Sequence, residues 1–139
     1  MAKIYFAAPM RGVREALKEV RELIRLVESR GHVVLTKHVA EETLDTDRGL
    51  SHREVFERDV RLLEEADMLI AEVSYPSLGV GFEIAYALLR GKKTVALVKH
   101  ERMDSLSSLI RGITWENFYL VDYGEPSEAV EKLAAKGLI

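Results

Sequence analysis

A single carboxylate interrupts an otherwise apolar helical segment in the middle of the chain. Residues 82–89 read FEIAYALL, and Glu83 is their one charged side chain before Arg90. Burying an ionised group costs on the order of several kcal/mol unless the group is paired. A carboxylate in the first turn of a helix is favoured in its ionised form, so one alternative is an ordinary acid at a helix start. The apolar surroundings favour a catalytic carboxylate instead.

The residues before this segment predict an anion site. Residues 68–73 form an apolar run typical of a buried strand, and Pro76, Ser77, Gly79 and Gly81 then suggest a glycine-rich turn. A helix that begins after such a turn presents unpaired N–H groups and the positive end of its dipole. We therefore expect this junction to favour an anion above the sheet.

A second acid lies on the preceding helical segment. Ser51 and Glu54 have the spacing of a capping box, which predicts a helix from there to about Ala66. On that helix Asp59 falls at helical spacing from Val55, on the apolar face. We predict that Asp59 points inward.

The elements that position these acids alternate between strands and helices. Such alternation implies right-handed crossovers and a parallel sheet with helices on both faces. The fold class is α/β, a doubly wound (Rossmann/flavodoxin-like) five-stranded sheet of probable order 2-1-3-4-5, in one domain over 1–139. Residues 36–49 have no clear period, which predicts a loop over the sheet. Apolar runs predict strands at 4–8, 32–35, 68–73, 94–98 and 118–121, with helices at 13–30, 51–66, 82–90, 104–110 and 126–136.

The predicted strand order also locates a pocket. Ligands of doubly wound sheets bind above the carboxyl ends of the strands at the switch point, here between the first and third strands. Two cations at a helix start, Arg11 and Arg14, are unfavourable without a nearby anion, and this favours a phosphate there. The side chains expected to converge are those of the two loops at this edge: Arg11, Gly12, Ser77, Gly79 and Glu83.

Composition narrows the classes of function. The chain has 139 residues and a formal net charge of -3, which argues against a surface for nucleic-acid polymers. No apolar run approaches the roughly 20 residues of a membrane span. The absence of cysteine and of a signal peptide favours a cytoplasmic protein. The histidines are too scattered for metal-ligand spacing, so we expect no metal and no cofactor.

Five segments, taken together, resemble a known family. They are IYFAAPMRG, LTKHVAEE, RDVRLLEEAD, AEVSYPSLGVGFEIAYAL and LSSLIRG. Their order and sequence are similar to the 2'-deoxynucleoside 5'-phosphate N-hydrolases of the nucleoside 2-deoxyribosyltransferase superfamily, over nearly the whole chain. The resemblance implies cleavage of the N-glycosidic bond of a deoxynucleoside 5'-monophosphate, which yields a free base and 2-deoxyribose 5-phosphate.

The resemblance also implies roles for individual residues. Glu83 would be the nucleophile that attacks C1' and forms a deoxyribosyl-enzyme intermediate, which water then opens. Asp59 would orient the sugar and assist protonation of the departing base, and Tyr5 would hold the nucleophile in one rotamer. The substrate-binding residues would be Ala8, Pro9, Met10, Arg11, Gly12, Val13, Arg14, His38, Ser77, Gly79, Ser107, Ser108 and Leu109.

Two of these positions carry further expectations. Ser107 matches a serine that closes the phosphate site of the neighbouring subunit in this family, which implies a homodimer. Pro9 stands where the nearest relatives have a serine, and it offers neither a hydroxyl nor an N–H. One phosphate or sugar contact is therefore missing or replaced, so selectivity for monophosphates stays open.

Several alternatives remain at this point. Tyr5 could be a plain core residue, His38 a surface histidine, and Ser107 simple helix polarity. A nucleoside 2-deoxyribosyltransferase would differ only in whether a base or water resolves the intermediate. A non-catalytic nucleotide-binding domain on the same fold is a third alternative. The two inward acids count against it, because an anion binder gains nothing from carboxylates near a phosphate.

Overall fold

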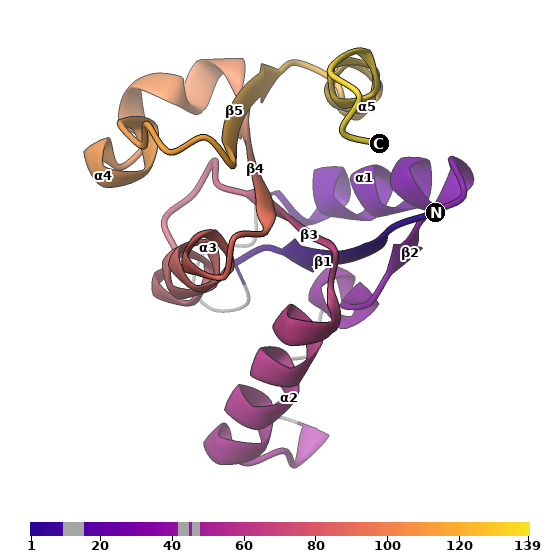
Figure 1. Cartoon of the computed structure of the whole chain (residues 1–139), viewed down its shortest axis with the longest axis vertical. Helices are drawn as coiled ribbons and strands as arrows, with labels where there is room; N and C mark the ends of the chain where they lie inside the picture. The colour runs from indigo at the N-terminus through magenta and orange to yellow at the C-terminus, as the bar shows by residue number, and fades with distance from the viewer. Residues whose placement is uncertain (10–15, 42–44, 46–47) are drawn as a thin grey trace.

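Five parallel strands form the sheet that carries the site (Figure 1). The computed structural model describes residues 1–9, 16–41, 45 and 48–139. The strand order is β2-β1-β3-β4-β5, and every neighbouring pair is parallel. This confirms the doubly wound sheet and the strand order predicted from the sequence. The strands are β1 (Lys3–Ala7), β2 (Val33–Val34), β3 (Met68–Glu72), β4 (Lys93–Lys99) and β5 (Phe118–Tyr123).

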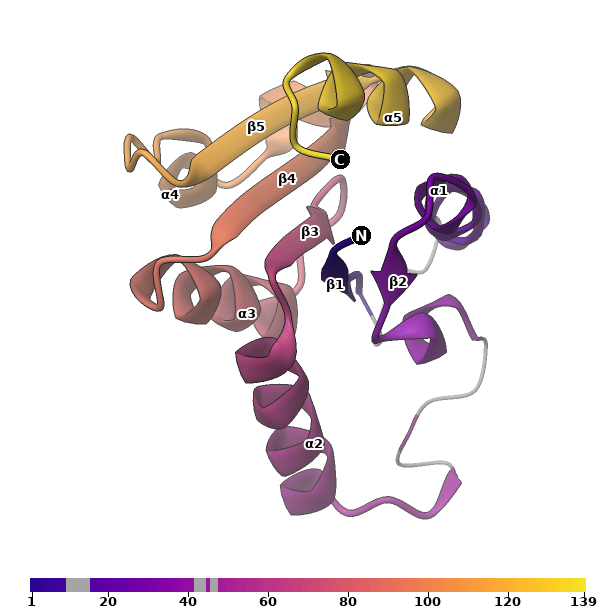
Figure 2. The ribbon, with the colours of Figure 1, turned by 45° about the vertical axis from the view of Figure 1, so that its right-hand side comes forward.

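Helices cover both faces of the sheet, as predicted. Figures 1 and 2 show α1 (Leu17–Ser29) and α5 (Pro126–Ala135) on one side, with α2 (His52–Glu65) and α3 (Leu78–Leu89) on the other. Alternate residues of β1 supply the two cores, because successive side chains of a strand point to opposite faces. Phe6 packs in the α1/α5 core, and Tyr5 packs in the α2/α3 core. Tyr5 therefore reaches the face that carries both candidate acids.

The predicted capping box starts α2. The hydroxyl of Ser51 accepts a hydrogen bond from the Glu54 N–H at 3.1 Å, and the Glu54 carboxylate accepts one from the Ser51 N–H at 2.9 Å. These reciprocal bonds satisfy donors that the first helical turn would otherwise leave open. They fix the helix register that places Asp59.

The start of α3 differs from the sequence prediction, which had the helix begin at residue 82. The helix begins at Leu78, with Ser77 as N-cap accepting from the Val80 N–H at 3.3 Å. Gly79 therefore lies inside the first helical turn, although its low helix propensity suggested a turn residue. The side-chain cap and the burial of Val80 override that propensity. Glu83 consequently lies in the second turn, where the helix dipole favours its ionised form less.

Other boundaries differ by smaller amounts. The loop predicted at 36–49 contains a short 3₁₀ helix, η1 (Lys37–Ala40). The helix predicted at 104–110 is instead a 3₁₀ helix, η3 (His100–Ser105), followed by α4 (Ser108–Arg111). Leu106 separates them in an extended conformation, which lets its side chain pack on the α2/α3 core. The first residues predicted for the first helix, 13–15, lie outside the described residues.

Candidate active site

A cavity of about 620 Å³ opens beside the carboxyl end of β1, between α2 and α3. Its lining includes Tyr5 and Ala8 from the first strand and its end, and His38 from η1. Asp59 and Glu83 reach it from α2 and α3, respectively. A cavity of this size suits a ligand of nucleotide dimensions. The structure thus brings these five sequence-predicted residues together.

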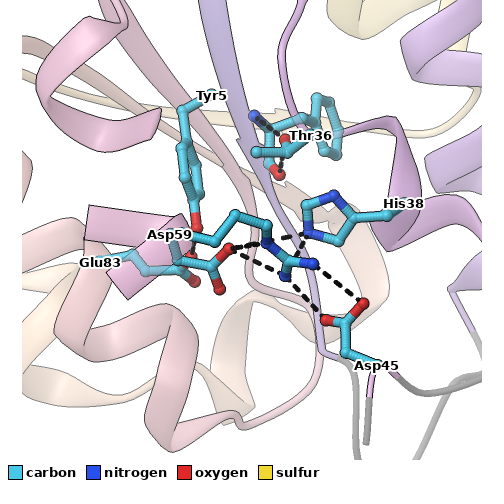
Figure 3. Close-up of polar contacts among 8 residues, drawn as sticks. Tyr5, Thr36, His38, Asp45, Asp59 and Glu83 are labelled. Atoms are coloured by element: carbon cyan, nitrogen blue, oxygen red, sulfur yellow. Dashed lines mark hydrogen bonds and ion pairs between the residues drawn. The ribbon is translucent and has the colours of Figure 1, made fainter. Parts of the chain in front are cut away.

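Glu83 and Tyr5 form a direct pair in this cavity (Figure 3). The Tyr5 hydroxyl donates a hydrogen bond to Glu83 Oε2. Burial raises the pKa of Tyr5, and the charges of Glu83 and Asp59 raise it further, so the phenol stays a donor. Tyr5 is therefore more than a core residue, since its ring is buried while its hydroxyl holds the carboxylate.

The pKa of Glu83 is raised, whereas a position in the first helical turn was expected to favour its ionised form. Burial raises the pKa of Glu83 to about 7, and the charge of Asp59 adds to the increase. The Tyr5 hydrogen bond and the charge of Arg58 oppose it. Near neutral pH the group therefore exists in both forms, and the ionised form is poorly hydrated, which suits a nucleophile.

Asp59 belongs to a charged network that lines the same cavity (Figure 3). Arg58 Nε donates to Asp59 Oδ1 at 3.0 Å, and Arg58 Nη2 donates to Asp45 Oδ2 at 2.8 Å. Arg58 Nη2 also lies 3.0 Å from His38 Nε2. Burial raises the pKa of Asp59 and lowers that of His38. The network connects η1, α2 and the residue Asp45 between them.

Residues from two other loops complete the description of the predicted site. Ser77 and Gly79 line the cavity, and Pro9 is buried next to Ala8. Met10, Arg11, Gly12, Val13 and Arg14 lie outside the described residues, so the predicted anion-binding arginines are not placed. Ser107, Ser108 and Leu109 are exposed on α4 and its N-cap, and do not line the described cavity.

Sequence reasoning missed three polar residues. The sequence patterns assign no role to Arg58 or Asp45, although the position of Arg58 next to Asp59 was an available signal. Glu72 ends an apolar strand and is fully buried, accepting hydrogen bonds from the Ser74 N–H at 2.6 Å and from the Tyr123 hydroxyl. It anchors the turn between β3 and α3 from the other face of the sheet. A charge inside an apolar run was its signal, the same signal that identified Glu83.

The described residues contain neither a metal-binding cluster nor a membrane-spanning helix. Within that part of the chain, no three histidine, aspartate or glutamate side chains are grouped closely enough to hold a metal ion. Likewise, no helix in the described ranges has both the length and the apolar character needed to cross a membrane.

Sequence comparison identifies the family. Residues 4–123 match the nucleoside 2-deoxyribosyltransferase family. The chain belongs to this family. The match spans all five strands and both acids, so it covers the whole described cavity.

Individual proteins of known sequence or structure resemble the chain over most of its length. A protein of Thermofilum pendens, provisionally named 2'-deoxynucleoside 5'-phosphate N-hydrolase 1, is 66% identical over 131 residues, covering 94% of this chain and 92% of its own. The 5-hydroxymethyl-dUMP N-hydrolase of Rattus norvegicus is 34% identical over 126 residues, covering 88% and 77%. The structure of Clostridium botulinum CMP N-glycosidase superposes with a TM-score of 0.73 at 25% identity, covering 96% and 98%.

Proposed function

We propose that the protein hydrolyses the N-glycosidic bond of 2'-deoxynucleoside 5'-monophosphates to a free base and 2-deoxyribose 5-phosphate. The observation that carries this proposal is the half-buried Glu83 carboxylate, held by Tyr5 in a cavity of nucleotide size that Asp59 also lines. The names of the relatives point to the same bond, since they are an N-hydrolase and an N-glycosidase of nucleotides.

The reaction proceeds in two displacements at C1'. The Glu83 carboxylate attacks C1', the C1'–N bond breaks, and its electron pair leaves with the base, which takes up a proton. Water then attacks C1' of the glycosyl ester, Glu83 leaves as a carboxylate, and a proton is released. Asp59 stabilises the oxocarbenium-like transition state and orients the sugar. Tyr5 keeps the attacking oxygen in place, which lowers the entropic cost of the first step.

The phosphate is proposed to bind at the start of α3. Ser77 and Gly79 line the cavity there, and the N-terminus of this helix favours an anion. Arg11 and Arg14 are proposed as its cationic partners. Pro9 cannot donate a hydrogen bond, so the dianion depends on the remaining donors. Binding energy at the phosphate then contributes to catalysis at the distant C1' atom.

The active unit is proposed to be a homodimer. Glu83, which reaches the cavity, is the one charged residue of α3, and Leu78 and Leu89 at its two ends are 97% and 75% exposed. A helix that is largely apolar around its circumference is typically buried. Leu109, beside Ser107, is also exposed, and Ile110 packs on the same core as α3. A two-fold interface here would offer Ser107 to the partner's cavity, and reciprocally.

A panel assay tests the proposed function. Purified protein is incubated with each 2'-deoxynucleoside 5'-monophosphate, the matching nucleosides and the matching ribonucleotides, and free base is measured. We expect base release from the deoxynucleoside monophosphates, with a much higher kcat/KM than for the nucleosides. Adding a second base in excess separates hydrolysis from transfer, because a transferase would form a new nucleotide. Release of no base from any substrate would contradict the proposal.

A further inference from the structure

The guanidinium of Arg58 joins three side chains that line the cavity. Asp59, Asp45 and His38 line the cavity, whereas Arg58 is not part of its described lining. Arg58 Nη1 and Nη2 donate to the two carboxylate oxygens of Asp45 at 3.1 and 2.8 Å. Its Nε donates to Asp59 Oδ1, and Nη2 lies against His38 Nε2, each at 3.0 Å. Arg58 is therefore placed to act on a ligand through these neighbours.

The contact with Arg58 decides which nitrogen of His38 carries the proton. A guanidinium has donors only and stays protonated, so His38 Nε2 has to accept the hydrogen bond. The proton of the neutral ring then lies on Nδ1. In a doubly protonated ring Nε2–H would face the Arg58 N–H, and neither of these two donors would have an acceptor there. Burial lowers the pKa of His38, and Arg58 lowers it further. The charged groups that face His38 are Arg58, Asp59, Asp45 and Arg48.

The same guanidinium favours the ionised form of Asp59. Arg58 Nε and Nη2 lie 3.0 and 2.9 Å from Oδ1. Among the described residues Oδ2 accepts no hydrogen bond, and Asp59 lines the cavity. Burial raises the pKa of Asp59, and Arg58 opposes that increase. The titratable or charged groups around Asp59 are Arg58, His38, Asp45, Glu83 and Tyr5.

We propose that Arg58 is a positioning residue of the site, which fixes His38 as the neutral tautomer protonated on Nδ1 and keeps Asp59 a hydrogen-bond acceptor. The catalytic part of this inference rests on the proposed function. The tautomer of His38 does not, because it follows from the Arg58 contact in the free protein. Because the proposal has Arg58 act through Asp59 and His38, it is not a catalytic residue.

Nitrogen NMR of the histidine ring tests the tautomer directly. Long-range ¹H–¹⁵N correlation spectra of wild type, Arg58→Gln and Arg58→Lys are compared, with His38→Gln identifying the His38 signals. We expect Nδ1–H in the wild type, a shift toward Nε2–H in Arg58→Gln, and an upward move of the His38 titration midpoint. Arg61→Gln is the matched control, since Arg61 is exposed on the same helix. An Nε2–H tautomer in the wild type, or no change in Arg58→Gln, would overturn the proposal.

Kinetics test the catalytic consequence. We expect Arg58→Gln to lower kcat/KM about tenfold or more, as expected when a charge-assisted hydrogen bond is lost. Its acidic pH limb should move to higher pH, because Arg58 lowers the pKa of both Asp59 and Glu83. Arg58→Lys keeps the positive charge but lacks the planar guanidinium with its several N–H donors. It should therefore keep the acidic limb of the pH profile at its wild-type position while recovering only part of kcat/KM. An unshifted limb in folded Arg58→Gln would overturn this part of the proposal.

The two proposals fail in different ways. If the wild type releases no base from any nucleotide, the proposed function fails, while the NMR spectra still decide whether Arg58 fixes His38. If the wild type is active and the NMR change is absent, only the role of Arg58 fails. Circular dichroism of each variant separates a positioning effect from unfolding, and Arg58→Lys provides a second variant if Arg58→Gln does not fold.

Discussion

The hydroxyl of Tyr5, in β1, donates a hydrogen bond to Oε2 of Glu83 in the second turn of α3. These residues lie 78 positions apart in the sequence, and the parallel pairing of β1 with β3 brings them together. The buried phenol stabilises the ionised carboxylate, whereas the apolar surroundings favour the protonated one. The balance between these two effects sets the pH at which Glu83 can act.

The first prediction concerns the pH dependence of catalysis. The pKa of Glu83 is raised to about 7 and its ionised form is the nucleophile, so kcat/KM should fall as the pH drops below 7. The expected slope on the acidic side is about tenfold per pH unit. Initial rates between pH 5 and 9 at low substrate concentration check this. A rate that stays constant down to pH 5 would contradict the assignment.

The second prediction distinguishes the titration of Glu83 from the titration of the substrate phosphate in the pH profile. The Tyr5 hydrogen bond lowers the pKa of Glu83, so Tyr5→Phe should move the acidic limb to higher pH. The phosphate of the substrate titrates near pH 6, but its pKa cannot depend on Tyr5. Rates of the two proteins are measured on one substrate across the same pH range. An identical limb in both would show that the hydrogen bond does not control the nucleophile.

The third prediction concerns stability. Glu83 has a higher pKa in the folded protein than in the unfolded chain, so the native state binds more protons between about pH 4.5 and 7. Stability from this group is therefore present at low pH and is lost as the pH rises through 7. Glu83→Gln should be more stable than wild type at pH 8, on the order of 1 to 3 kcal/mol, and the gain should shrink toward pH 5.

Urea unfolding of both proteins at pH 8 and pH 5 measures this difference. Glu131→Gln is the control, because Glu131 is exposed on α5 and its replacement should leave the pH dependence unchanged. A Glu83→Gln protein that is less stable than wild type at pH 8 would mean that the ionised Glu83 carboxylate does not destabilise the folded protein.

The fourth prediction concerns assembly. A charge placed in the exposed apolar side of α3 should disrupt the proposed dimer, so Leu89→Glu should shift the protein toward a monomer and lower its activity. Light scattering at assay concentration reports the mass. Glu131→Lys, which alters charge on the opposite face of the sheet, should leave both properties intact. Full activity in a monomeric Leu89→Glu protein would exclude a contribution of Ser107 to the neighbouring site.

Sequence patterns predicted the sheet well because its strands are buried on both faces. Residues 68–73 and 94–98 are nearly continuous apolar runs, and such runs are typical of central parallel strands. The same contrast revealed Glu83, since a lone charge in an apolar helix requires a reason. Asp59 was found from helical periodicity, which the capping box at Ser51 had anchored.

Two of the remaining features depend on tertiary contacts that no local pattern encodes, and a third was a misjudged local pattern. The sequence patterns assign no role to Arg58, and only the fold brings it against His38 and Asp45. The start of α3 was placed four residues late, because the propensity of Gly79 and Gly81 was weighed above the capping ability of Ser77. The raised pKa of Glu83 likewise follows from burial and from Asp59, which lies 24 positions earlier in the sequence.

The central claim is that Glu83 attacks C1' and carries the sugar as an ester. Rapid quenching of the wild type with a deoxynucleoside 5'-monophosphate, followed by proteolysis and mass spectrometry, tests it most directly. We expect a deoxyribose 5-phosphate adduct on the wild-type peptide that contains Glu83, and no adduct in Glu83→Gln. This variant should fold but lose nearly all turnover. An adduct on another residue, or substantial turnover by Glu83→Gln, would contradict it.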